Sequence, residues 1–142
     1  MDAAARPEDG DRRDSRICVV DDDAGVCHSL SVVLEAYGYP VLTFSSAAAF
    51  LSDDRHRRAA LLIIDQHMPE MGGLDVVAAL KREEIVVPAM LITGRLDPSI
   101  IECANKLGVT AVLEKPFSVS RLVDLVRVAM GRDQGAAAMK RS

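Results

Sequence analysis

Apolar runs of strand length alternate with amphipathic stretches over residues 17 to 130. The runs typical of strands lie at residues 17–21, near Val41, and at residues 61–65, 87–93 and 111–113. The third and fourth runs are apolar throughout, which is expected of central strands that helices cover on both faces. The weaker second and fifth runs suit positions nearer the edges. This alternation predicts an α/β domain in which helices cover a parallel sheet.

Helical periodicity fills the segment between the first two runs. Its apolar stripe is formed by Val26, Leu30, Val33, Leu34 and Tyr37, and Gly38 ends it. We interpret Asp23 as the cap of this helix, because acids are common at helix starts. The basic cluster at residues 55–58 is interpreted as a solvated loop.

Two later helices carry clearer boundary signals. Asp97 can cap a helix in which Pro98 takes the first position, and Gly108 can end it. Ser118 can cap the last helix. We expect that helix to end near Met130, because a glycine follows.

Both ends of the chain differ from its body. Residues 1–16 hold five acids and four arginines with almost no apolar content, which predicts a disordered tail. Residues 131–142 are similarly poor in core residues and are expected to form a flexible tail. The 142 residues therefore predict one folded domain, at 17–130.

The overall composition excludes several classes of function. Seventeen basic residues stand against 21 acidic ones, a net charge of −4, so neither nucleic acid nor an anionic membrane is favoured as a partner. The three cysteines are scattered, which argues against a disulfide framework or a zinc site. The chain shows neither a membrane-spanning run nor a signal peptide, so we expect a cytoplasmic protein.

Polar side chains gather where the predicted strands end. Asp21 and Asp22 follow the first run, Asp65 and Thr93 close the third and fourth, and Lys115 lies just beyond the fifth. In an open parallel α/β sheet, ligands bind beyond the carboxyl ends of the strands. These five residues are therefore expected to form one site.

Crowding of three carboxylates is unfavourable without a counter-ion. Two like charges about 4 Å apart repel by roughly 4 kcal/mol at an effective dielectric near 20. Hard carboxylate oxygens suit Mg²⁺, or alternatively Mn²⁺. Beside such an ion, Asp65 could attack a phosphoryl group while Lys115 neutralises the phosphoryl oxygens. The Thr93 hydroxyl could then donate to a phosphoryl oxygen, and we expect it to have no comparable partner beforehand.

Four motifs in this order, VVDDD, LLIIDQHMPEMGGLD, LITG and LEKPF, resemble the receiver domains of response regulators. The resemblance covers essentially the whole body of the chain. It implies a doubly wound, flavodoxin-like receiver fold, with a five-stranded parallel sheet of order 2-1-3-4-5 and five helices.

The resemblance also implies a signalling role. Asp65 would accept a phosphoryl group from a phosphohistidine on a sensor histidine kinase or a phosphotransfer protein. The domain would catalyse only its own phosphorylation and dephosphorylation. Asp22, Asp65 and the backbone carbonyl of His67 would ligate Mg²⁺, while Asp21 would hold a metal-bound water. The fourth helix, fifth strand and fifth helix would form the output surface, for a downstream protein or a phosphorylation-dependent dimer.

The match departs from the family pattern at Val112, three residues before Lys115. Val112 stands where many receivers carry Tyr or Phe, so we hypothesise weaker coupling between Asp65 and the output surface. His67 and Arg95 occupy the positions that in this family line the path of the hydrolytic water. We hypothesise that they tune the lifetime of the phosphoryl group.

Two other classes of protein could use a similar fold. A phosphatase with an aspartyl nucleophile would need a second Asp where this chain has His67. A flavin or mononucleotide module would need a phosphate cradle after the first strand, where the acids would repel phosphate. The length favours a stand-alone regulator if the chain is complete, whereas a truncated transcription factor would lack its DNA-binding domain.

Overall fold

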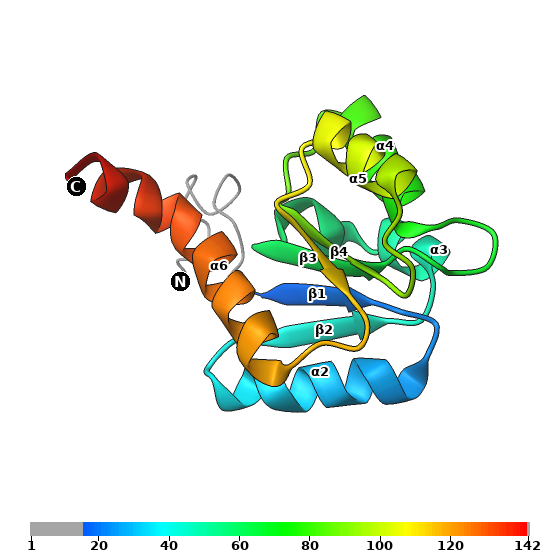
Figure 1. The fold of residues 1–142 in the computed structure, drawn as a ribbon, viewed down its shortest axis with the longest axis horizontal. Coiled ribbons are helices and arrows are strands. Elements are labelled where there is room, and N and C mark those ends of the chain that lie inside the picture. Colours follow the sequence, from blue (N-terminus) through cyan, green and yellow to red (C-terminus); the bar gives the residue numbers. More distant parts are fainter. Residues whose placement is uncertain (1–15, 142) are drawn as a thin grey trace, which may run out of the picture.

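A computed structural model describes the backbone of residues 16–141 and the side chains of residues 16–131. It contains one parallel sheet of order β2-β1-β3-β4-β5 (Figure 1). The strands are β1 (Ile17–Val20), β2 (Val41–Phe44), β3 (Leu61–Asp65), β4 (Ala89–Thr93) and β5 (Ala111–Glu114). The predicted strand number, direction and order are confirmed. The disordered tail predicted for residues 1–16 lies, except for Arg16, outside the described residues.

Five α-helices in the described part of the chain cover the two faces of the sheet, as predicted. They are α2 (Ala24–Ala36), α3 (Ala47–Leu51), α4 (Gly73–Arg82), α5 (Pro98–Leu107) and α6 (Val119–Arg141). Helices α2 and α6 lie on one face, and α3, α4 and α5 lie on the other (Figure 1). None of the described helices is both long and apolar enough to cross a bilayer.

Alternation along the strands divides the core into two layers. Cys18 and Val20 of β1 pack with the layer under α3, α4 and α5. Ile17 and Val19 of the same strand pack with the layer under α2 and α6. Because β3 and β4 are buried on both faces, their runs are apolar throughout, as expected of central strands. β4 begins at Ala89 rather than at Val87, since Pro88 has no N–H to donate to the ladder.

The buried stripe of α2 differs from the predicted one. Cys27, Leu30 and Leu34 are its buried residues, whereas Tyr37 is 49% exposed. The prediction placed Tyr37 in the core, but the helix ends before it, at Ala36. The Tyr37 ring lies under the guanidinium of Arg127, 5.4 Å from the ring centroid, and so contacts α6.

The predicted caps of the last two helices are confirmed, but the end of α6 is not. Asp97 accepts from Ile100 N, and Gly108 ends α5 with a positive φ of 75°. Ser118 Oγ accepts from Arg121 N at 3.0 Å. The expected end near Met130 is wrong, because α6 continues to Arg141. A glycine inside a helix costs only about 1 kcal/mol relative to alanine, so it does not have to end one. The flexibility of residues 131–142 stays a prediction.

The basic cluster at residues 55–58 is not the solvated loop that was predicted. It belongs to a 3₁₀ helix, η1 (Asp54–Arg58), in which His56 is buried. The His56 ring packs edge-on against Phe50, with centroids 5.5 Å apart, and its Nδ1 donates to the Asp53 carbonyl. One apolar contact and one hydrogen bond therefore turn this histidine inward.

Asp53, which caps η1, should titrate well below an ordinary aspartate. Hydrogen bonds from the Arg55 guanidinium, with the Arg55 N–H, lower the pKa of Asp53 from 3.8 to about 2. A lowered folded-state pKa means that the stabilisation is present above 3.8 and is lost as the pH falls toward 2. Titration of the Asp53 carboxyl carbon by NMR should show this low midpoint. Arg55→Ala should return the midpoint toward 3.8, and an unchanged midpoint in that variant would refute the assignment.

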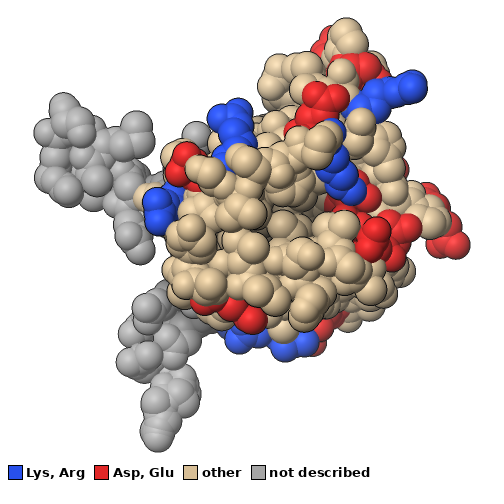
Figure 2. Space-filling view, turned by 60° about the horizontal axis from the view of Figure 1, so that its bottom comes forward, with Lys and Arg blue, Asp and Glu red and all other residues tan. Residues whose placement is uncertain are grey.

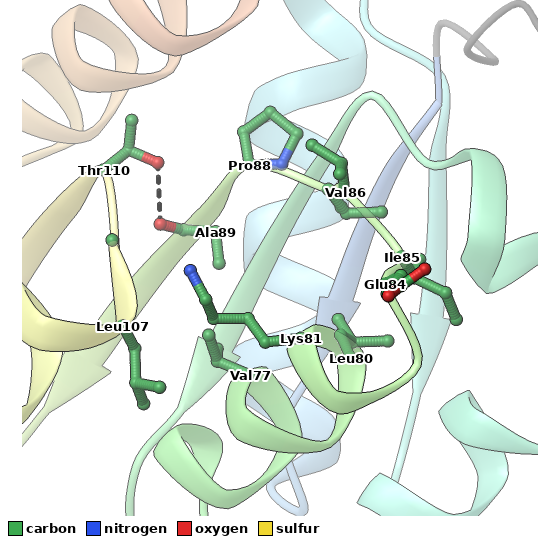
Figure 3. A pocket seen from close by; sticks show the side chains of 12 residues that line it. Val77, Leu80, Lys81, Glu84, Ile85, Val86, Pro88, Ala89, Leu107 and Thr110 are labelled. Atoms are coloured by element: carbon green, nitrogen blue, oxygen red, sulfur yellow. Dashed lines mark hydrogen bonds between the residues drawn. The ribbon is translucent and has the colours of Figure 1, made fainter.

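A mostly apolar hollow of about 410 Å³ lies between the C-terminal ends of α4 and α5 (Figure 3). Val77 and Leu80 of α4 line it together with Leu107 of α5, and Lys81 lies at its wall. Pro88 and Ala89 place it at the start of β4. It therefore lies at the amino ends of the strands, away from the predicted site.

Candidate functional site

The five predicted site residues converge at the carboxyl edge of the sheet. Asp21, Asp65 and Thr93 are the buried polar residues here, with exposed fractions of 2%, 4% and 0%. Asp22 is exposed beside them, and Lys115 is half-buried. Figure 2 shows a group of acidic side chains at the right of the face in view, while other acidic and basic side chains are spread over the rest of that face. The structure thus brings the five residues together as the strand-end rule predicts.

Three carboxylates form the acidic part of the site. One oxygen each from Asp21, Asp22 and Asp65 lies within 4.8 Å of the others. Burial raises the pKa of Asp21, and the nearby charge of Asp65 raises it further. The Asp21 Oδ1 atom accepts from Asp23 N at 2.9 Å. Asp21 Oδ2 and Asp65 Oδ1 are buried without a hydrogen-bond partner. Buried carboxylate oxygens without hydrogen-bond partners are costly, so the cluster needs a compensating positive charge.

Lys115 supplies part of that positive charge. Its Nζ atom lies 3.6 Å from Asp65 Oδ1 and 3.8 Å from Asp21 Oδ2, which are the two oxygens without hydrogen bonds. The Lys115 backbone N–H donates to Thr93 O at 2.8 Å. This bond holds Lys115 next to the end of β4. One ammonium therefore faces two buried carboxylates at ion-pair distance.

The donor atoms at this cluster fit a hard divalent cation. All three candidate ligands are carboxylates, two of them buried, and no cysteine or histidine of the described residues belongs to the cluster. The two unpartnered oxygens and the net negative charge are what such an ion would satisfy. The residues present therefore fit Mg²⁺ or Mn²⁺. Ligation by the His67 carbonyl stays a prediction.

The Thr93 hydroxyl makes three contacts, two with the backbone of Arg95 and one with the His67 ring, which corrects the expectation that it has no partner comparable to a phosphoryl oxygen. It accepts from Arg95 N at 3.1 Å and donates to Arg95 O at 2.9 Å. His67 Nε2 lies 2.9 Å from the same oxygen. The sequence showed His67 and Arg95 near this edge, but it could not show that both contact Thr93. Arg95 makes its two bonds through the backbone.

The loop at residues 66–72, which follows Asp65 and is called the acceptor loop below, is fixed to α4 in a way that sequence reasoning missed. Gln66 Oε1 accepts from Leu74 N at 2.8 Å and so caps this helix from the residue next to Asp65. A Cβ on Gly72 would lie 2.4 Å from the Gln66 carbonyl oxygen, and one on Gly73 would lie 3.0 Å from that of Asp65. The two glycines are needed for this close approach. The Gly-Gly pair in the sequence was the available signal.

Cys27 of α2 contacts the backbone of the site at Asp21. Its thiol donates to the Asp21 carbonyl at 3.3 Å, and burial raises the pKa of that thiol. The interpretation of Asp23 as a cap is confirmed, because its Oδ1 atom accepts from Gly25 N and Val26 N. The acids after β1 therefore divide between the site and the helix.

Val112, which stands where many receivers carry Tyr or Phe, is half-buried. Val112 of β5 packs against the core layer under α3, α4 and α5. Two residues on, Glu114 Oε2 accepts from Leu96 N at 3.3 Å. This bond links β5 to the loop that follows Thr93.

Comparison with known proteins gives a consistent result. The family model described as "Response regulator receiver domain" matches residues 17–127. The response regulator protein TodT of Pseudomonas putida is 37% identical over 118 residues, which is 83% of this chain and 52% of that protein. The transcriptional regulatory protein FixJ of Bradyrhizobium diazoefficiens is 32% identical over 121 residues, 85% of this chain and 59% of FixJ. The chain spans about half the length of these curated relatives.

A solved structure supports the same assignment. The crystal structure of FixJ-N superposes with a TM-score of 0.75 at 31% identity, covering 83% of this chain and 94% of that chain. The fold and the motifs therefore agree over the same region. This agreement favours the receiver over the phosphatase and nucleotide-binding alternatives.

Proposed function

The chain belongs to the response regulator receiver family, and on this premise we propose that it is a phosphorylation switch whose acceptor is Asp65. The donor is a phosphohistidine on a sensor histidine kinase or a phosphotransfer protein. The observation that carries this proposal is the pair of buried carboxylate oxygens, on Asp21 and Asp65, that have no hydrogen bond and face one ammonium. Such a pair is costly for a purely structural site.

The chemical step is a single transfer. One Asp65 carboxylate oxygen forms a bond to phosphorus as the bond from phosphorus to the donor's imidazole nitrogen breaks, and the electron pair stays on that nitrogen. The Lys115 ammonium is positioned to interact with the phosphoryl oxygens, because it already contacts Asp65. Hydrolysis of the acyl phosphate returns Asp65 to its starting state. The domain catalyses only these two steps on itself.

The acidic cluster would hold the cation. Asp22 and Asp65 are proposed as direct ligands of Mg²⁺, with the His67 carbonyl as a third, and Asp21 as the holder of a metal-bound water. An ion bound there would neutralise negative charge on the phosphoryl group during transfer. Burial of Asp21 and Asp65 keeps both carboxylates fixed before the phosphoryl group arrives.

The signal is proposed to leave through the surface formed by α5, β5 and α6. Thr93 would turn its hydroxyl toward a phosphoryl oxygen and carry the loop after β4 with it. Val112 lacks the aromatic ring of many receivers, so the link to this surface is proposed to run through the backbone and through the Leu96 N–H that donates to Glu114. The occupant would be a downstream protein or a second copy of the chain. Arg95 and His67 would set the lifetime of the phosphoryl group.

The direct test is chemical phosphorylation of the purified chain. Incubation with acetyl phosphate or phosphoramidate and Mg²⁺ should raise the intact mass by one phosphoryl group, and hydroxylamine should remove it, as expected of an acyl phosphate. Chelation of the metal with EDTA should prevent the gain. Turnover of a small phosphomonoester should stay at background, because a receiver is not a phosphatase. Sustained turnover, or a mass gain that resists hydroxylamine, would contradict the proposal.

A further inference from the structure

The hydrogen bonds of Thr93 impose a constraint on the His67 ring. A hydroxyl oxygen has one proton to donate and two lone pairs to accept with. The Thr93 proton goes to Arg95 O, and one lone pair accepts from Arg95 N. The remaining contact is His67 Nε2, at 2.9 Å. All three bonds exist together only when His67 carries a proton on Nε2 and donates it.

From this geometry we propose that His67 is a positioning residue that holds Thr93 in its unphosphorylated conformation. The inference rests on the proposed function and extends it from the acceptor to the switch. Thr93 is fully buried, so its hydroxyl bonds to protein groups rather than to solvent in this conformation. His67 is exposed and reaches Thr93 from the acceptor loop, 26 residues earlier in the chain. The bond thus joins the loop after β3 to the end of β4.

Phosphorylation has to break this arrangement. To donate to a phosphoryl oxygen on Asp65, the Thr93 hydroxyl must take its only proton away from Arg95 O. To do so the hydroxyl must rotate. The bonds from His67 and from Arg95 N oppose this rotation, because it turns the oxygen lone pairs away from both donors. His67 thereby lowers the affinity of the site for a phosphoryl group or its analogue. The Arg95 contribution is made by the backbone and is present with any side chain at that position.

The ligand-free protein offers a first test that does not depend on phosphorylation. Long-range ¹H–¹⁵N NMR spectra of the imidazoles should show His67 protonated on Nε2 in the wild-type chain. Thr93→Val, which removes the hydroxyl and nearly keeps the shape, should shift the His67 nitrogens and leave those of His28 on α2 unchanged. Protonation of His67 on Nδ1 alone, or identical His67 spectra in both proteins, would overturn the proposal.

The second test measures affinity for beryllofluoride, a phosphoryl analogue, in the presence of Mg²⁺. His67→Ala should bind it about 3- to 10-fold more tightly than the wild type, the range expected for one hydrogen bond. His67→Gln, which retains a side-chain N–H donor, should fall between the two. In a Thr93→Val background, His67→Ala should change nothing. His28→Ala, which replaces an exposed histidine on α2, is the matched control and should bind like the wild type.

The outcomes separate the two proposals. Unchanged or weaker binding by His67→Ala overturns the positioning role, as does an equal effect of His67→Ala with and without the Thr93 hydroxyl. If the wild type itself binds no beryllofluoride, the proposed phosphoacceptor function fails. The NMR comparison of His67 in the ligand-free proteins then still decides whether the His67 bond to Thr93 exists.

Discussion

Asp65→Asn should abolish the gain of a phosphoryl group from acetyl phosphate. The amide has no anionic oxygen to attack phosphorus, and it removes one of the three carboxylates that would hold the cation. Asparagine keeps the size of the side chain in a position that is 4% exposed, so the fold should be retained. Intact mass after incubation with Mg²⁺ measures the result, and circular dichroism checks the fold.

A matched control is available on α6. Asp124→Asn removes the same formal charge from an exposed position that does not belong to the acidic cluster, and it should be phosphorylated like the wild type. Peptide mapping of the phosphorylated wild type should locate the group on Asp65. A full mass gain by Asp65→Asn would show that another residue is the acceptor, with the exposed Asp22 as the neighbour to examine.

Asp21→Asn should stabilise the protein when no divalent cation is bound. Carboxylate oxygens of Asp21 and Asp65 lie within 4.8 Å, where two charges repel by about 3 kcal/mol at an effective dielectric near 20. Lys115 offsets part of this repulsion. Removing one charge should therefore raise the free energy of unfolding by about 1 to 2 kcal/mol, or Tm by about 3 to 10 °C. Asparagine keeps an oxygen that can accept from Asp23 N.

The pH dependence of the stability difference between Asp21→Asn and the wild type is a second check on its sign. Burial is the largest cause that raises the folded-state pKa of Asp21 above 3.8, and the charge of Asp65 adds to it, while the hydrogen bond from Asp23 N acts in the opposite direction. A group with a raised folded pKa stabilises the fold below its unfolded pKa, and this stabilisation is lost as the pH rises through the folded value. The advantage of Asp21→Asn should therefore be absent below pH 3.8 and complete above the raised pKa. Thermal unfolding in EDTA over this range measures it.

Addition of Mg²⁺ should reduce the stability advantage of Asp21→Asn. A ligand that binds only the folded state stabilises it according to its affinity, and the wild type offers one more carboxylate to the ion than Asp21→Asn does. Mg²⁺ should accordingly raise the Tm of the wild type more than that of the variant. Asp124→Asn should respond to Mg²⁺ like the wild type. If Asp21→Asn is less stable than the wild type in EDTA, crowding of the carboxylates does not limit stability.

Local chemistry in the sequence was sufficient to predict several features of this protein. The caps at Asp23, Asp97 and Ser118 were predicted correctly, because a cap depends on the residue and the few that follow it. The central strands were predicted because burial on both faces requires continuous apolar runs. Residues at the carboxyl ends of adjacent parallel strands must share one edge of the sheet. The site residues could therefore be named before their distances were known, although the strand order came from the family resemblance.

Other features depended on contacts between distant segments. His56 turned inward because Phe50 offered an aromatic face, which the basic residues around it did not suggest. Tyr37 stayed outside the core, beside Arg127 of α6. The bond between His67 and Thr93 joins two loops 26 residues apart. Sequence determined which residues reach the edge of the sheet, because that follows from local pattern and strand direction. Only the tertiary structure decided which side chains satisfy one another there, because a buried hydroxyl takes the partners that folding brings within about 3 Å.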